Sequence, residues 1–195
     1  SKWDLAAQAY AEVIKYPPPN NKVYGYAWYK LGYVHWNKGD FAQALNAFKK
    51  TIEYGVAYSQ VPNAKKLAES ARRDIIPVYA LKGDPAQAYN FFKGISGDAG
   101  GKNTATYKMM DDLGVNYLDT GHYREAITLY KDLMSRDREG NTCVYQAHIT
   151  EATMALQSSN KDAIVKEVYN QFKVHATYSK SGAAAGPKAE CANKT

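Results

Sequence analysis

The sequence has no long hydrophobic run and very little cysteine, and both shortages exclude classes of protein. Its most apolar segment is the short stretch between Asp74 and Lys82, whereas a membrane-spanning helix needs about 18 or more apolar residues. The two cysteines, Cys143 and Cys191, belong to no CxxC or CxxH motif, and the four histidines are scattered. This spacing argues against zinc. We therefore expect no membrane span, no metal and no cofactor.

The sequence also has no large excess of charge of either sign. The 195 residues contain 25 Lys and Arg against 19 Asp and Glu, a net charge of +6. A basic cluster does occur on common faces of a helix, but the remaining charges are well mixed, so a solvated helix face explains the cluster better than a nucleic-acid interface. Its members are Lys65, Lys66, Arg72 and Arg73. We expect no nucleic-acid partner.

Aromatic residues, by contrast, are abundant. Tyrosine occurs 17 times, and Phe, Trp and Tyr make up 13% of the chain. So many rings must either fill a core or line a surface.

The chain repeats itself. Glycine turns recur at Gly39-Asp40, Gly83-Asp84 and Gly121-His122, with spacings of 44 and 38 residues. After each turn comes an alanine with a ring four residues later, which places both on one face of a helix. These pairs are Ala44 with Phe48, Ala88 with Phe92, and Ala126 with Tyr130.

A second helical pattern precedes these turns. It reads Trp28-x2-Leu31-Gly32-x2-His35 before the first turn. Before the third turn it reads Met110-x2-Leu113-Gly114-x2-Tyr117. The repeating unit is therefore a helix, a short turn and a second helix, with small residues where the two helices approach closely.

This unit resembles the tetratricopeptide repeat (TPR), whose signature is W-x2-L-G-x2-Y followed by Ala-x3-Phe. The resemblance implies an all-α protein, a right-handed α-solenoid of antiparallel helix pairs without enzymatic activity. We expect residues 1–19 to hold the second helix of a truncated repeat. Three repeats follow within 20–137, then a degenerate capping pair over 138–178 and a flexible linker over 179–195. The three repeats are expected at about 22–54, 62–94 and 104–137.

Four aromatic residues of the first complete repeat, Tyr26, Tyr29, Tyr33 and Trp36, are spaced to form one stripe on a helix. The resemblance to TPR proteins places this stripe on the concave side. The corresponding positions of the next two repeats supply Arg73, Lys108 and Asp111. These residues predict a groove that grips a segment of a partner protein. In the alternative, the stripe is buried as ordinary core and the protein is a structural spacer.

Nothing in the sequence completes an enzyme site. His148 follows Cys143 by five residues, yet no third group is placed to orient a catalytic dyad. The cysteine count alone is compatible with two free thiols or with one disulfide. A bridge between Cys143 and Cys191 is the interpretation we favour, because it would tie the tail to the last helix pair; it would also imply an exported protein.

The run from Ala64 to Gly94, together with the placement of the two cysteines, is similar to periplasmic TPR proteins of myxobacterial gliding motility, of the Agl/Glt type. This narrower resemblance implies a periplasmic adaptor in a cell-envelope complex, with other envelope or motility proteins as partners. The alternatives are an accessory of outer-membrane assembly and a cytoplasmic location.

Overall fold

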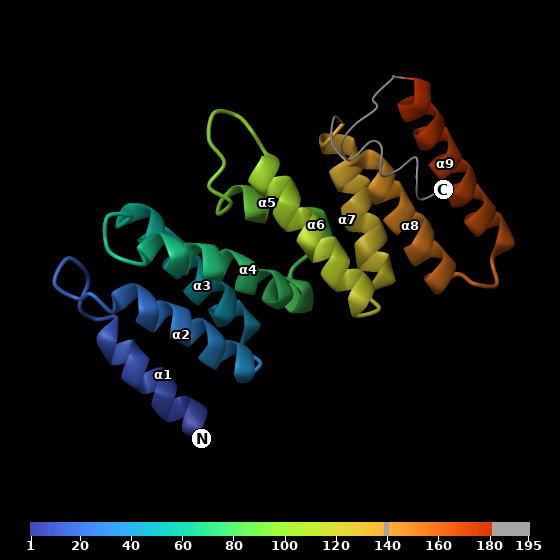
Figure 1. Ribbon diagram of the computed structural model, residues 1–195. Coiled ribbons are helices and arrows are strands. Elements are labelled where there is room, and N and C mark those ends of the chain that lie inside the picture. Colours follow the sequence, from blue (N-terminus) through green and yellow to red (C-terminus); the bar gives the residue numbers. More distant parts are fainter. Residues whose placement is uncertain (139–140, 181–195) are drawn as a thin grey trace. The chain divides into compact units, whose positions relative to one another are not determined.

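The computed structural model describes residues 1–138 and 141–180, and the regular structure of this part of the chain is entirely helical (Figure 1). The all-α prediction is therefore confirmed. In chain order the elements are α1 (Lys2–Val13), α2 (Tyr24–Asn37), α3 (Phe41–Ala57), α4 (Ala64–Lys82), the 3₁₀ helix η1 (Pro85–Gln87), α5 (Ala88–Lys93), α6 (Thr104–Asp119), α7 (Tyr123–Arg136), α8 (Thr142–Leu156) and α9 (Lys161–Lys180).

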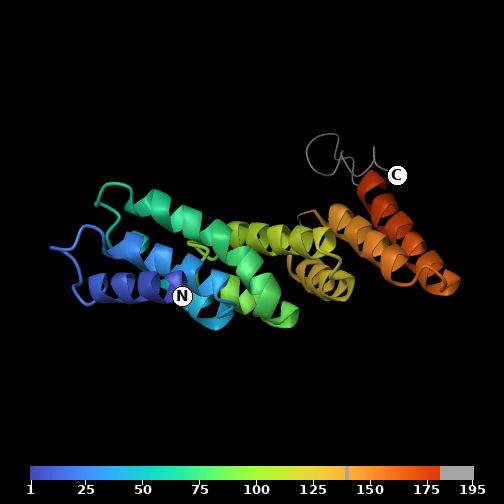
Figure 2. The ribbon, with the colours of Figure 1, turned by 90° about the horizontal axis from the view of Figure 1, so that it is seen from below.

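The helices pack against their neighbours in sequence within two compact units. The first unit comprises Ser1–Asp84 with Asn90–Lys102, where α2 lies between α1 and α3, and α3 packs on α4. The second comprises Pro85–Tyr89 and the described residues from Asn103 onward, where α7 packs on α6 and α8, and α8 packs on α9. Figures 1 and 2 show α8 and α9 side by side, running in opposite directions. Packing of this kind is consistent with a TPR-like solenoid.

The first helix pair, α2 and α3, is closely packed because a glycine faces a ring. A Cβ added at Gly32 would lie 2.7 Å from Cε1 of Phe48. Phe48 is completely buried, as is Ala44 one turn before it. The turn between the helices uses Gly39, whose φ of +76° lies in the left-handed region that favours glycine.

The pair α6 and α7 repeats this arrangement in the second unit. Gly114 lies directly against the ring of Tyr130, with no room for a Cβ. Tyr130 and Ala126 are fully buried, and the turn again contains a glycine with a φ of +76°, Gly121. The predicted small-residue and ring positions thus form the two helix–helix contacts.

The second repeat is less regular. Pro77 lies inside α4, which continues to Lys82. After the turn the chain forms η1 and then only six residues of α5. Glycines with positive φ follow in the loop after α5, and they favour a loop over a longer helix. Arg72 holds this loop to α4, since its Nε donates a hydrogen bond of 2.7 Å to the carbonyl of Ile95.

The last described helix, α9, includes residues 179–180, which the sequence predicted as linker. The rest of the predicted linker lies outside the described residues. On α9 the side chains of Val165, Tyr169 and Phe172 are between 59% and 65% exposed, whereas a terminal capping helix is expected to have a polar outer face.

Candidate protein-binding site

The aromatic stripe of α2 divides into an exposed end and a half-buried remainder. Tyr26, near the start of the helix, is 49% exposed. Tyr29, Tyr33 and Trp36 are half-buried. The helix turns its smaller residues inward instead, and Gly25, Ala27, Leu31, Gly32 and Val34 are its buried positions.

Tyr29 and Tyr33 both bind Asp74 of α4. Their hydroxyl groups donate hydrogen bonds of 2.5 Å and 2.7 Å to the same oxygen, Oδ2. Both rings also meet Phe48 edge to face, at centroid distances of 5.9 Å and 5.4 Å. The middle of the stripe is therefore a contact between the first helices of two successive repeats.

Burial is the main reason why the pKa of Tyr33 and that of Tyr29 are raised above the ordinary tyrosine value, and the hydrogen bonds to Asp74 add to the effect. Both phenols are thus held in the neutral form, which donates to the carboxylate. Sequence reasoning missed Asp74. It follows Arg73 directly, but a helical register alone does not say which of two adjacent polar residues faces the neighbouring helix.

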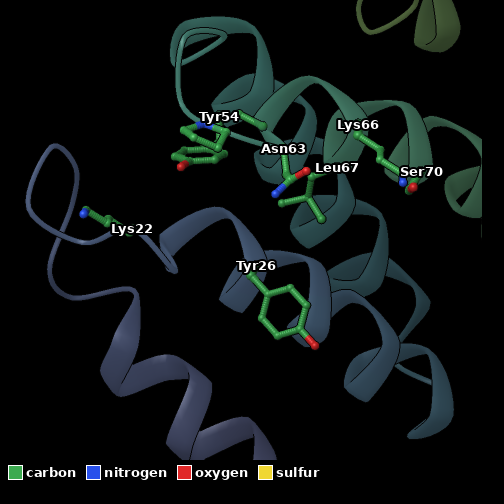
Figure 3. Close-up of a pocket in the computed structure, with 9 residues that line it drawn as sticks. Lys22, Tyr26, Tyr54, Asn63, Lys66, Leu67 and Ser70 are labelled. Atoms are coloured by element: carbon green, nitrogen blue, oxygen red, sulfur yellow. The ribbon is translucent and has the colours of Figure 1, made fainter.

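A pocket of about 440 Å³ opens beside Tyr26 in the first unit. Four segments form it: the loop before α2, the first turn of α2, the last part of α3, and the chain at the start of α4. Figure 3 shows Lys22 at one side, Lys66 and Ser70 at the other, and the ring of Tyr26 on α2 between them. The lining residues are Lys22, Tyr26, Tyr54, Pro62, Asn63, Ala64, Lys66, Leu67 and Ser70.

Tyr54, one of the aromatic residues that line this pocket, is held in place by close packing. Tyr54 is only 6% exposed and stacks on Tyr58 at a centroid distance of 5.3 Å. Gly25 lies against its ring on the α2 side, with no room for a Cβ. Burial, with a smaller contribution from Tyr58, raises the pKa of Tyr54. Tyr54 therefore presents a neutral ring to the pocket.

Arg73, a predicted groove residue, lies beside the pocket. Its side chain is exposed, and its Nη2 donates a hydrogen bond of 3.2 Å to Oγ of Ser70, which lines the pocket. The structure thus connects Arg73 to the same face as Tyr26. Lys66, which the sequence assigned to a solvated basic cluster, is part of the pocket itself.

The other two predicted groove residues, Lys108 and Asp111, belong to the second unit. Lys108 is exposed and pairs with Asp112 at 2.8 Å. Asp111 is half-buried and accepts a hydrogen bond of 3.1 Å from the hydroxyl of Tyr130. Burial raises the pKa of Asp111, although the bond from Tyr130 acts in the opposite direction. Both side chains therefore have partners on α6 and α7.

Cys143 and His148 both lie on α8. Cys143 is 5% exposed. The ring of His148 stacks on Tyr130 at 4.9 Å, and its Nδ1 lies 3.7 Å from a carboxylate oxygen of Glu151. Cys191 lies outside the described residues, so its bridge to Cys143 stays a prediction.

No group of three or more His, Cys, Asp and Glu side chains in residues 1–138 and 141–180 is arranged to hold a metal ion. Within the same ranges, no helix combines the length and the apolar character needed to cross a bilayer.

Comparison with known proteins supports the TPR resemblance. Residues 25–55, which span α2 and most of α3, match the tetratricopeptide repeat family. No curated protein matches the chain significantly. The described part of the chain is thus all-α, and its α2–α3 pair matches the tetratricopeptide repeat, a module that typically binds other proteins and is generally not enzymatic. Neither the match nor the fold supports the narrower resemblance to gliding-motility proteins.

Proposed function

We propose that this protein is a non-enzymatic adaptor that binds a segment of a partner protein at the exposed end of the aromatic stripe, where Tyr26 borders the pocket. The observation that carries this proposal is the pocket of about 440 Å³ between α2 and α4. Two of its lining residues, Tyr26 and Tyr54, belong to the segment that matches the tetratricopeptide family, and the others come from the flanking chain. Concave, partly aromatic pockets are where proteins most often bind ligands.

The proposed binding surface is shorter than the predicted groove. Tyr29 and Tyr33 already use their hydroxyl groups on Asp74, and they act mainly by fixing α4 beside α2. Tyr26 is the stripe residue with the largest exposed ring, and Arg73 lies beside the pocket through its bond to Ser70. A partner segment would therefore contact Tyr26 and the pocket first.

The alternative function, a structural spacer, is favoured by the half-buried middle of the stripe. Three of its four rings are already partly covered, and two of them bind the next repeat. A spacer needs no open surface at Tyr26. The two functions therefore differ in whether a partner contacts the Tyr26 end.

Site-specific photocrosslinking separates the two. Benzoylphenylalanine would replace Tyr26 in one variant and Val56, an exposed residue of α3 (61%), in a control. We expect a discrete adduct from position 26 and none from position 56, with the captured protein identified by mass spectrometry and the complex rebuilt from the two purified proteins. Equal crosslinking at both positions, or none at position 26, would favour the spacer.

We further propose that the adaptor works in the periplasm, within a cell-envelope complex of the gliding-motility kind. The support is the sequence resemblance and the interpretation of Cys143 and Cys191 as a bridge. Maleimide labelling of the denatured protein from cells lysed with acid tests this location. We expect labelling only after reduction. Labelling of both thiols without reduction would favour the cytoplasm.

A further inference from the structure

We infer that the pocket beside Tyr26 recognises an acidic peptide segment, with a carboxylate side chain between Lys22 and Lys66 and a neighbouring apolar side chain against Tyr26 and Leu67. This inference rests on the proposed function and specifies its partner: the segment is internal to the partner chain and carries Asp or Glu beside an aromatic or aliphatic residue.

The charge of the pocket is the first argument. Lys22 and Lys66 are both exposed, and neither forms an ion pair with any residue that the structure describes. No carboxylate is among the nine lining residues. Lys30 adds a further positive charge nearby, since its Nζ lies 5.1 Å from the centre of the Tyr26 ring. The site is therefore complementary to a negative group.

The backbone next to Lys22 is held by Asn21, its neighbour in the loop. Asn21 donates hydrogen bonds of 2.8 Å and 2.7 Å from its amide to the carbonyl groups of Val13 and Tyr16. The loop between α1 and α2 is thereby tied to the end of α1. Lys22 thus extends from a held segment, and Figure 3 shows it on the opposite side of the pocket from Lys66.

The apolar part of the pocket is the second argument. Tyr54 and Tyr26 offer rings, and Leu67 and Pro62 offer aliphatic surface, beside the two lysines. A free phosphate or a nucleic-acid backbone would use the charges and leave these surfaces in water. A peptide with adjacent acidic and apolar side chains uses both, and buried apolar anchors surrounded by polar contacts are typical of peptide recognition.

Binding to an array of short peptides tests this inference, using the full chain. Each peptide is acetylated and amidated, so that no terminal carboxylate is present. A central Phe, Leu or Gly is flanked by Asp and Glu, by Asn and Gln, or by Lys. We expect the peptides that combine acidic flanks with Phe or Leu to bind best, and those with Lys flanks to bind least.

Two double variants identify the pocket as the site. In the first, Lys22→Gln and Lys66→Gln remove its two charges. In the matched control, Lys49→Gln and Lys65→Gln remove two exposed charges that do not line it. For the best peptide we expect an affinity loss of about fivefold or more in the first and less than about twofold in the control, given the usual strength of exposed ion pairs. Circular dichroism would show that both variants retain the helical content of the parent.

Salt provides an independent measurement. Raising NaCl from about 0.1 M to about 1 M shortens the Debye length from about 10 Å to about 3 Å. The difference in affinity between the parent and the Lys22 and Lys66 variant should then shrink, because the lost interaction is electrostatic. A difference that persists at high salt would overturn the assignment of these lysines to a carboxylate.

The failure of this inference differs from the failure of the proposed function. Equal binding of acidic and neutral peptides, or equal losses in both double variants, would overturn the acidic specificity. Binding of none of the peptides, while position 26 still crosslinks to a partner, would also overturn it and leave the adaptor function intact. The absence of crosslinking at position 26 would overturn the adaptor function itself.

Discussion

Tyr33 on α2 donates a hydrogen bond of 2.7 Å to Asp74 on α4. The same carboxylate oxygen accepts a hydrogen bond from Tyr29, so one side chain of the second repeat fixes two rings of the first. This contact gives the aromatic stripe two different uses. Its middle holds the repeats together, and the Tyr26 end stays open beside the pocket.

Replacing Asp74 with alanine should lower the free energy of unfolding by about 1 to 2 kcal/mol, because two half-buried hydroxyl groups lose a charged acceptor. Urea denaturation followed by circular dichroism would measure the change. Glu69→Ala is the matched control, since this carboxylate is exposed on the same helix, and it should change stability by less than about 0.5 kcal/mol. An equal loss in the free energy of unfolding at both positions would show that the tyrosine contacts do not stabilise the fold.

Alanine at Gly32 or Gly114 should destabilise the protein by about 1 to 3 kcal/mol, since the new methyl group would overlap the facing ring. The better helix propensity of alanine offsets this only in part. Gly94→Ala is the control, because the nearest atom to its Cβ would be 3.4 Å away. A Gly114→Ala variant as stable as the parent would mean that α6 and α7 are packed less closely than described.

Alkaline pH should destabilise the protein, partly through Tyr79. Burial raises the pKa of Tyr79 to about 12, from 10.0 for an ordinary tyrosine. The folded state therefore keeps this proton where the unfolded state loses it, so the stabilisation is complete below about pH 10 and is lost as the pH rises towards 12.

The variant Tyr79→Phe loses the hydrogen bond of 2.8 Å to the carbonyl of Asp84, so it should be less stable at neutral pH by about 0.5 to 1.5 kcal/mol. Between pH 10 and 12, however, its stability should fall less steeply than that of the parent. Urea denaturation across this range would measure both effects. Tyr16→Phe, at a position that is 69% exposed, should keep the parental slope; an unchanged slope in Tyr79→Phe would contradict the explanation.

Serine at both Val165 and Phe172 of α9 should change the free energy of unfolding by less than about 0.5 kcal/mol, because these side chains are 65% and 60% exposed. Leu133→Ala, at a fully buried position of α7, should cost about 2 to 5 kcal/mol under the same conditions. Thermal and urea denaturation would compare them. A large cost for the α9 variant would show that another surface covers this face.

The repeat pattern predicted the helix pairs well, because the residues that form each pair are close in sequence. The pairing of Gly32 with Phe48 and that of Gly114 with Tyr130 follow from a small residue on one helix and a ring on the next, separated by a short glycine turn. The short α5 was harder to predict. Its Ala88 and Phe92 fit the pattern, but the positive-φ glycines of the following loop leave it only six residues.

The sequence by itself determined the helical repeats and the spacing of the aromatic stripe, since helical periodicity is a local property, whereas the exposure of Tyr26 came from the structure. Only the tertiary structure decided that Tyr29 and Tyr33 bind Asp74, and that Lys22, Tyr54 and Lys66 meet around one pocket. These residues come from different segments. Their meeting depends on how successive helices are rotated and spaced against one another, and the packing of glycines and rings between the helices sets that rotation and spacing.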